Sequence, residues 1–135
     1  MAILSSASKF SNFGLLILRL GLGAMMIVHG FPKLIGGPEK WAAIGSAMTH
    51  MGISGYFALF GFLAAISEAI GGALIILGLA FRPACLMLIG TMIVAATMHL
   101  KSGDGIGTAS HAIELAFVFF GLFFVGPGRL SIDKG

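Results

Sequence analysis

The chain has 135 residues, 58% of them hydrophobic and only 10% charged, and its mean hydropathy is +1.05. Soluble domains carry about 25% charged residues, so this composition excludes a soluble protein and indicates an all-α integral membrane protein. The length allows a single domain, residues 1–135, built as a four-helix bundle with no room for a separate soluble domain.

The basic residues give a net charge of +3 but are scattered singly along the chain. No basic run interleaved with aromatic residues is present, which argues against nucleic-acid binding. Cys85 is the single cysteine, so an internal disulfide and dithiol chemistry are excluded. We expect Cys85 to be a small apolar packing residue.

The first spanning helix is expected over residues 12–34, with Pro32 and the glycine pair 36–37 ending it. A run of about 20 apolar residues matches the thickness of the hydrocarbon layer. The run is longer than the core of a signal peptide and lacks a small-residue cleavage site. We therefore expect it to remain attached as a membrane helix.

Arg19, Met26, His29 and Lys33 share one face of this helix, within an arc of about 80° at about 100° per residue. A charged side chain inside a membrane span is costly and normally marks a functional site or a buried partner. Lipid does not solvate these groups, so the face that carries them is expected to point toward other helices.

Residues 38–53 are less apolar and too few to cross a membrane. Pro38 suits the first position of a helix, Glu39 suits its positive end, and Trp41 is of a type enriched at membrane interfaces. We predict a short interfacial or re-entrant helix over about residues 38–48 that acts as a lid on one side of the bundle. A plain surface loop is the alternative.

The second span, residues 56–79, holds Glu68 near its middle. Small residues recur every four positions along it, and such a strip allows another helix to approach closely. This small-residue strip consists of Gly61, Ala65, Ala69 and Ala73. It also makes a homo-oligomer an expected arrangement.

The third and fourth spans are expected over residues 83–100 and 110–125. Thr91, Ala95 and His99 are four residues apart and share a face of the third span. His111 and Glu114 are three residues apart and share a face at the start of the fourth span.

Four crossings place both termini on the same side of the membrane. The count of Lys and Arg outside the spans slightly favours cytoplasmic termini. Four basic residues lie on the terminal side and three on the opposite side: Lys9, Arg82, Arg129 and Lys134 against Lys33, Lys40 and Lys101.

This topology predicts a polar funnel that opens toward the non-cytoplasmic face. A rise of about 1.5 Å per residue places Arg19 and Glu68 at comparable depth near the middle of the membrane. We expect them to form an ion pair at the floor of the funnel, since pairing lets both stay ionised. A pair that only fixes the packing of the helices is the alternative. The outer residues of the funnel are His29, Lys33, His99, His111 and Glu114.

The funnel residues favour proton exchange or ligand binding over a purely structural role, because imidazole and carboxylate take up and release protons near neutral pH. The same groups also ligate zinc, iron or haem. No two of His29, His99 and His111 have the four-residue spacing of a helical metal pair, so no metal or haem is predicted.

The order and spacing of several segments resemble the DoxX family of small bacterial four-helix membrane proteins. These segments are RLGLGAMMIVHGFPKL (residues 19–34), EAIGGALIILGLAFR (residues 68–82), the His99 and Glu114 positions, and GPGRLSID (residues 126–133). The resemblance implies a multi-pass protein of the bacterial inner membrane. It further implies a subunit of a quinone-linked redox system, connected with thiol, sulfur or oxidative-stress chemistry.

The leading hypothesis is therefore a polar intramembrane pocket that binds a quinone or a similar amphipathic ligand. Electrons would pass to a small redox substrate or a partner oxidoreductase subunit, since the chain has no recognisable redox centre of its own. The expected proton-exchanging, catalytic residues are His29, Glu68, His99 and Glu114. The residues expected to hold the quinone are Arg19, Lys33, Glu68 and His111.

Two other classes of function stay open at this point. The first is a non-enzymatic membrane scaffold, chaperone or lipid-binding protein whose buried charges only specify helix packing. The second is a transporter or channel, which is less attractive because four short helices leave little space for alternating access.

Overall fold

The computed structural model describes residues 2–134, and every regular element in this range is helical. Four segments are long and apolar enough to cross a membrane: 6–35, 57–77, 81–101 and 106–125. The predicted all-α membrane fold with a short helix between the first two spans is confirmed. The elements are α1 (Ala2–Ser5), η1 (Ser6–Phe10), α2 (Ser11–Ile35), α3 (Pro38–Gly45), η2 (Ser46–Met51), α4 (Phe57–Leu77), α5 (Phe81–Lys101) and α6 (Ile106–Val125).

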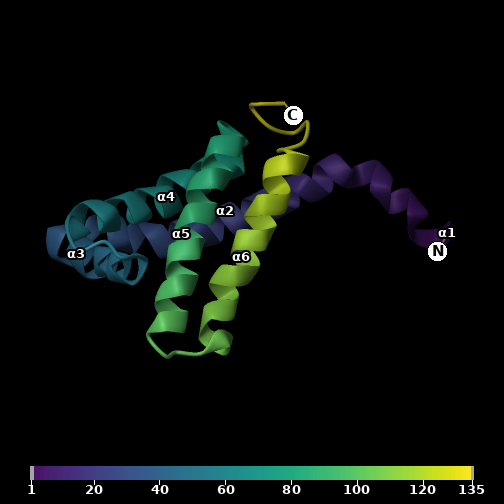
Figure 1. Cartoon of the computed structure of the whole chain (residues 1–135). Helices are drawn as coiled ribbons and strands as arrows, with labels where there is room; N and C mark the ends of the chain where they lie inside the picture. The colour runs from purple at the N-terminus through teal and green to yellow at the C-terminus, as the bar shows by residue number, and fades with distance from the viewer. Residues whose placement is uncertain (1, 135) are drawn as a thin grey trace.

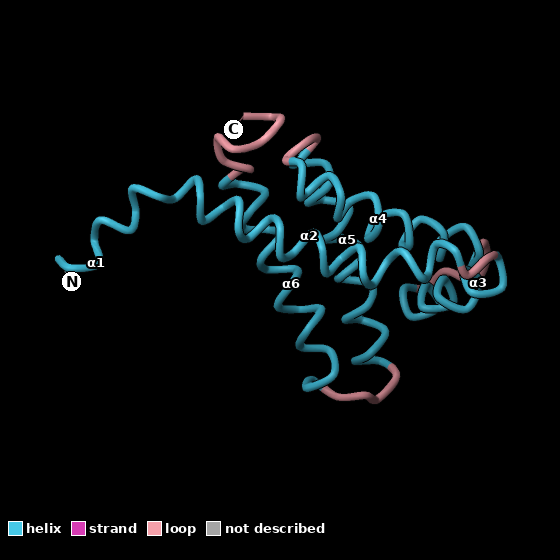
Figure 2. The backbone as a smooth tube through the Cα atoms, turned by 180° about the vertical axis from the view of Figure 1, so that it is seen from behind, coloured by secondary structure: helices cyan, strands magenta, loops and turns pink. Residues whose placement is uncertain are grey.

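The four long helices form two pairs that cross one another (Figure 1). α2 packs against α4, α5 packs against α6, and the α4–α5 contact joins the two pairs. The same arrangement is visible from behind, where the N-terminal helical segment extends away from the rest (Figure 2). Two cavities lie between these elements, one lined mainly by α3, η2, α4 and α5 and the other mainly by α2, α5 and α6.

The lid, defined here as α3 and η2, packs on the first half of α4, and η2 also contacts α5. Gly37 has a φ of 88°, a left-handed conformation that glycine adopts without strain, and Pro38 follows as the first residue of α3. The predicted short helix between the first two spans is therefore present. On the other side of Gly37, α2 continues through Pro32 to Ile35, so the prediction that Pro32 helps to end the helix is wrong.

Close approach of small residues fixes the register of the helix pairs. A Cβ atom added to Gly23 of α2 would lie 2.5 Å from the carbonyl oxygen of Gly72 in α4. One added to Gly61 would overlap the carbonyl of Trp41 in the lid. The small-residue strip does receive neighbouring helices, as predicted, but they are α2 and α3 of the same chain. This occupation removes the strip as an argument for a homo-oligomer.

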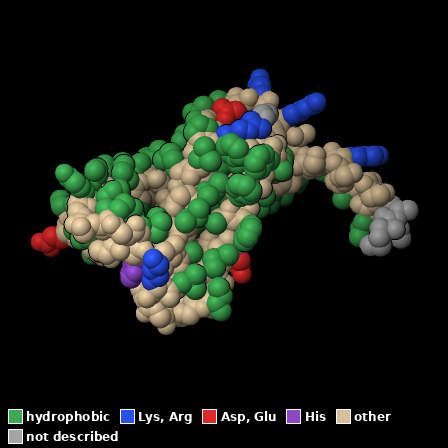
Figure 3. Space-filling view, in the orientation of Figure 1, with side chains coloured by type: hydrophobic (Ala, Val, Ile, Leu, Met, Phe, Trp, Pro, Cys, Tyr) green, Lys and Arg blue, Asp and Glu red, His purple; other side chains and the backbone are tan. Residues whose placement is uncertain are grey.

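The C-terminal tail, residues 126–134, folds back onto the start of α2, so both ends of the transmembrane region lie together. The Arg129 backbone N–H donates to Asn12 Oδ1 over 3.0 Å. Asp133 accepts hydrogen bonds from the N–H groups of Ala80 and Phe81, at 3.1 and 2.8 Å, where α5 begins. Figure 3 shows Lys and Arg side chains gathered near this end, above a face covered by hydrophobic side chains.

Candidate functional site

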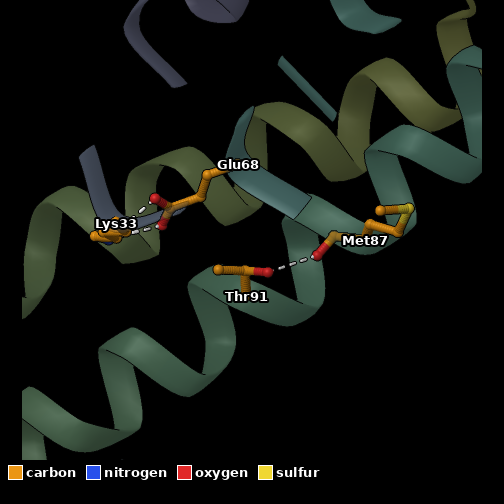
Figure 4. A network of polar contacts seen from close by, with 4 residues as sticks. All are labelled: Lys33, Glu68, Met87 and Thr91. Atoms are coloured by element: carbon orange, nitrogen blue, oxygen red, sulfur yellow. Dashed lines mark hydrogen bonds and ion pairs between the residues drawn. The ribbon is translucent and has the colours of Figure 1, made fainter. Parts of the chain in front are cut away.

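An ion pair between α2 and α4 is the centre of the candidate site. Lys33 Nζ lies 3.0 Å from Oε2 and 3.2 Å from Oε1 of Glu68, and Figure 4 shows the ammonium facing both carboxylate oxygens. The Glu68 side chain is 6% exposed and that of Lys33 is 33% exposed. Close packing of Gly30 against the backbone of Glu68 and Ala69 brings the two helices together at this level.

The predicted ion pair between Arg19 and Glu68 is wrong. Arg19 is buried, and its guanidinium donates to four backbone carbonyls: Ile75 at 3.0 Å, Ile76 at 2.7 Å, Pro127 at 3.0 Å and Leu130 at 2.8 Å. Carbonyls at the end of α4 have no partners within the helix, so Arg19 satisfies them and ties the tail to the helix. Arg19 lines neither of the two cavities.

The error in depth follows from the register of the antiparallel helices. Because Gly23 meets Gly72, Arg19 lies beside Ile76, two turns along α4 from Glu68. Counting residues from the expected ends of the spans does not reveal this offset. Lys33, near the other end of α2, is the residue that reaches Glu68.

A larger cavity of about 620 Å³ lies on one side of the ion pair, between the lid, α4 and α5. Its wall is mostly apolar, and Lys33, Glu68, Ser67, Thr91 and His99 supply its polar groups. Leu63, Leu86 and Met87 belong to the wall and are also exposed on the outer surface, at 48%, 55% and 39%. The cavity therefore opens sideways between α4 and α5, toward the region that lipid occupies.

A smaller cavity of about 220 Å³ lies on the other side of the pair, between α2, α5 and α6. His29, His99, His111 and Thr108 line it, and the rings of His29 and His111 are 6.0 Å apart. Lys33, Glu68, Ala95 and His99 line both cavities. The Lys33–Glu68 pair and His99 thus form the partition between an apolar space and a histidine-lined space.

Most of the predicted site residues converge here. Lys33, Glu68 and His99 form the partition, and His29 and His111 line the smaller cavity. Glu114 is exposed and lines neither cavity. The face predicted for Thr91, Ala95 and His99 is directed into the larger cavity.

Sequence reasoning did not single out Ser67, which is 9% exposed and contributes to the larger cavity. Its position beside Glu68 was visible, but the direction of α5 was needed to place it on the cavity side. Asp104 was also missed: its Oδ2 lies 2.8 Å from Nδ1 of His99. The short spacing between these two residues across a glycine-containing turn is the signal that could have indicated the contact.

The lid closes the end of the larger cavity and is attached at two places. The Trp41 ring N–H donates to the carbonyls of Lys33 and Leu34, at 3.0 and 3.2 Å, and its ring packs against Phe62. On the α5 side, Lys101 Nζ donates to the carbonyl of His50 over 2.6 Å. Trp41 is therefore hydrogen-bonded to the backbone of Lys33, a residue of the partition.

The site can bind a ligand with an apolar body and a polar end. Ammonium, carboxylate and hydroxyl groups stand at one end of an otherwise apolar cavity, where both charges are already compensated. Between residues 2 and 134, no group of three His, Cys, Asp or Glu side chains is arranged to hold a metal ion.

Comparisons with known proteins agree with this architecture. The chain is 28% identical over 143 aligned positions to the inner membrane protein YphA of Escherichia coli (strain K12), covering 93% of this chain and 96% of the relative. No solved structure matches the chain significantly. The DoxX family model matches residues 14–100, which contain the ion pair, the lid and most of the first three spans. This multi-pass membrane protein belongs to the DoxX family.

Proposed function

We propose that the protein is a membrane subunit of a quinone-linked oxidoreductase system and binds a quinone or similar amphipathic ligand at the partition. The apolar body of the ligand lies in the larger cavity, and its polar head contacts Lys33 and Glu68. The observation that carries this proposal is the position of the ion pair, between an apolar cavity and a histidine-lined one.

The residues present fit a quinone head. A volume of about 620 Å³ is within the range of small-molecule sites, which are mostly apolar with a few oriented polar groups. A quinone carbonyl accepts a hydrogen bond from the Lys33 ammonium, and a quinol hydroxyl donates one to Glu68. When bound, a quinone supplies exchange of two electrons and two protons.

The chain's own contribution is to place protonatable groups beside that head. His99 belongs to both cavities and Glu68 to the partition, so a proton held on either group is next to the ligand. His29 and His111 lie behind the partition and extend the set of proton-accepting groups toward water. The electrons come from a small redox substrate or a partner subunit.

The inner membrane is the proposed location, with cytoplasmic termini. YphA is an inner membrane protein by name, and this chain is similar to it along nearly its whole length. The arrangement of Lys9, Arg82, Arg129 and Lys134 near the terminal side supports this orientation under the positive-inside rule.

Lipid binding without redox chemistry is the second candidate, because the larger cavity opens sideways where Leu63, Leu86 and Met87 are exposed. A lipid-binding protein would take up neutral lipids but would not change the redox state of a quinone. Supplying a reduced thiol and decylubiquinone to the reconstituted protein distinguishes the two: quinone absorbance falls only if the protein is part of a redox system that accepts this donor.

The direct test uses Trp41, the only tryptophan in the chain, as a reporter. Quinones quench tryptophan fluorescence at short range, and Trp41 is bonded to the backbone of Lys33. Titration of decylubiquinone into purified protein is expected to give saturable quenching, which Glu68→Gln weakens. Quenching that rises linearly with quinone concentration in both proteins would remove the proposal.

A further inference from the structure

The charge balance of the larger cavity indicates which head groups it accepts. Lys33 is the only lysine or arginine in its wall, and both carboxylate oxygens of Glu68 lie within 3.2 Å of the Lys33 ammonium. A ligand that carries a negative charge would meet the Glu68 carboxylate as well as the ammonium, so the two contributions largely cancel. His99, the other basic side chain of the wall, has Oδ2 of Asp104 2.8 Å from its Nδ1, so the cavity has no uncompensated positive charge for a phosphate or carboxylate head.

Hydrogen-bonding capacity, in contrast, is left over at the same place. An ammonium carries three hydrogens, and Glu68 uses two contacts, which leaves one N–H of Lys33 for a ligand. The Thr91 hydroxyl donates to the carbonyl of Met87 over 2.9 Å (Figure 4). The lone pairs of this hydroxyl remain available as acceptors.

The second observation concerns the hydroxyl of Ser67. It is more than nine-tenths buried, it lines the larger cavity, and its hydroxyl makes no hydrogen bond to any residue that the structure describes. Every fully shielded side-chain N or O atom of the described residues has a hydrogen-bond partner, so the Ser67 hydroxyl is not sealed within the protein and is accessible from the cavity. Such a group at the polar end of a cavity is expected to be satisfied by whatever fills it.

We propose that the larger cavity selects amphipathic molecules with an uncharged, oxygen-bearing head, and that Ser67 is a specificity-determining residue that hydrogen-bonds this head. The inference rests on the proposed function, and it excludes fatty-acid anions and anionic phospholipids as preferred occupants. In this arrangement Lys33 donates a hydrogen bond to the head group from a charge-compensated pair.

The experiment compares two competitors with the same tail, 1-dodecanol and dodecanoate, for their ability to reverse quenching of Trp41 by decylubiquinone. In the unmodified protein, dodecanol is expected to compete at a concentration at least about tenfold lower than dodecanoate. Glu68→Gln frees the charge of Lys33, so the order of the two competitors reverses. Glu39→Gln is the matched control, because Glu39 lies on the same helix as Trp41, is exposed and lines neither cavity.

Ser67→Ala removes the unpartnered hydroxyl without changing charge. The substitution is expected to weaken the binding of dodecanol and decylubiquinone by about threefold to tenfold. The binding of dodecanoate is expected to stay unchanged. Equal competition by dodecanol and dodecanoate in the unmodified protein, with quenching still saturable, overturns the head-group selectivity and leaves the proposed function standing.

The proposed function can also fail while the head-group preference is still tested. If decylubiquinone gives no saturable quenching, the proposed function fails. Direct binding of radiolabelled dodecanol and dodecanoate then measures the head-group preference without the quinone, and stronger binding of dodecanoate overturns the inference.

Discussion

The Lys33 ammonium faces both carboxylate oxygens of Glu68, at 3.0 and 3.2 Å, and this pair separates an apolar cavity from a histidine-lined one. Glu68 is almost fully buried, whereas a third of the Lys33 side chain is exposed. The carboxylate thus depends on Lys33 for compensation more than Lys33 depends on the carboxylate.

The dependence can be measured with a double-mutant cycle. Lys33→Met leaves a buried carboxylate without its partner and is expected to lower the free energy of unfolding by about 3 kcal/mol. Glu68→Ala is expected to cost less, about 1–2 kcal/mol, because the exposed part of Lys33 is solvated. The double variant is expected to be more stable than the sum of the two losses implies. Thermal unfolding in detergent measures all three, and strict additivity would show that the pair does not contribute to stability.

Arg19 is predicted to have a structural role. Arg19→Leu removes four hydrogen bonds to carbonyls and is expected to cost at least about 3 kcal/mol, since bonds from a charged donor are worth about 1.5–3 kcal/mol each. Hydrogen exchange is expected to rise first in the tail, residues 126–134, because two of the four carbonyls belong to it. Unchanged exchange in the tail of Arg19→Leu would contradict this role.

Asp133 is expected to cap α5. Its carboxylate accepts from the N–H groups of Ala80 and Phe81, so Asp133→Ala is expected to cost about 1 kcal/mol. Asp133→Asn retains one acceptor oxygen and is expected to lose less. Melting temperatures of the two variants check the order; if Asp133→Asn is the less stable, the capping explanation fails.

The contact between the lid and α4 is tested with two glycines. A Cβ atom at Gly61 overlaps the Trp41 carbonyl, whereas one at Gly121 of α6 meets no atom within 4 Å. Gly61→Ala is therefore expected to displace the lid, lower stability and shift the Trp41 emission spectrum. Gly121→Ala is the control and is expected to be neutral or slightly stabilising, since alanine favours helix by about 1 kcal/mol over glycine. Identical spectra and stability for the two variants would place the lid elsewhere.

The spans, the short helix and the polar face of α2 could be predicted because they depend on local patterns. Each of these patterns can be interpreted within a single helix. They are the apolar runs of sufficient length, Pro38 at a helix start, and the four-residue spacing of Thr91, Ala95 and His99. The same patterns identified eight of the residues that line the cavities: Met26, His29, Lys33, Glu68, Thr91, Ala95, His99 and His111.

The pairing of the charges depends on the register between helices, which no local pattern fixes. The contact of Gly23 with Gly72 shifts α4 so that Arg19 meets helix-end carbonyls and Lys33 meets Glu68. A sequence also draws attention to acidic side chains as partners of an arginine. Backbone carbonyls accept hydrogen bonds from a guanidinium equally well, but every residue has one, so the sequence does not single them out. Ser67 was missed for a related reason, because the cavity beside it forms only when α5 crosses α4.

Photoaffinity labelling with an azido-quinone in proteoliposomes, followed by peptide mass spectrometry, tests most directly whether an amphipathic ligand occupies the cavity at the Lys33–Glu68 pair. The cavity lining predicts adducts within residues 43–48, 60–68 and 86–99, which excess decylubiquinone suppresses. Adducts that resist this competition, or that gather on the outer face of α6 around Phe117 and Phe124, would contradict the account.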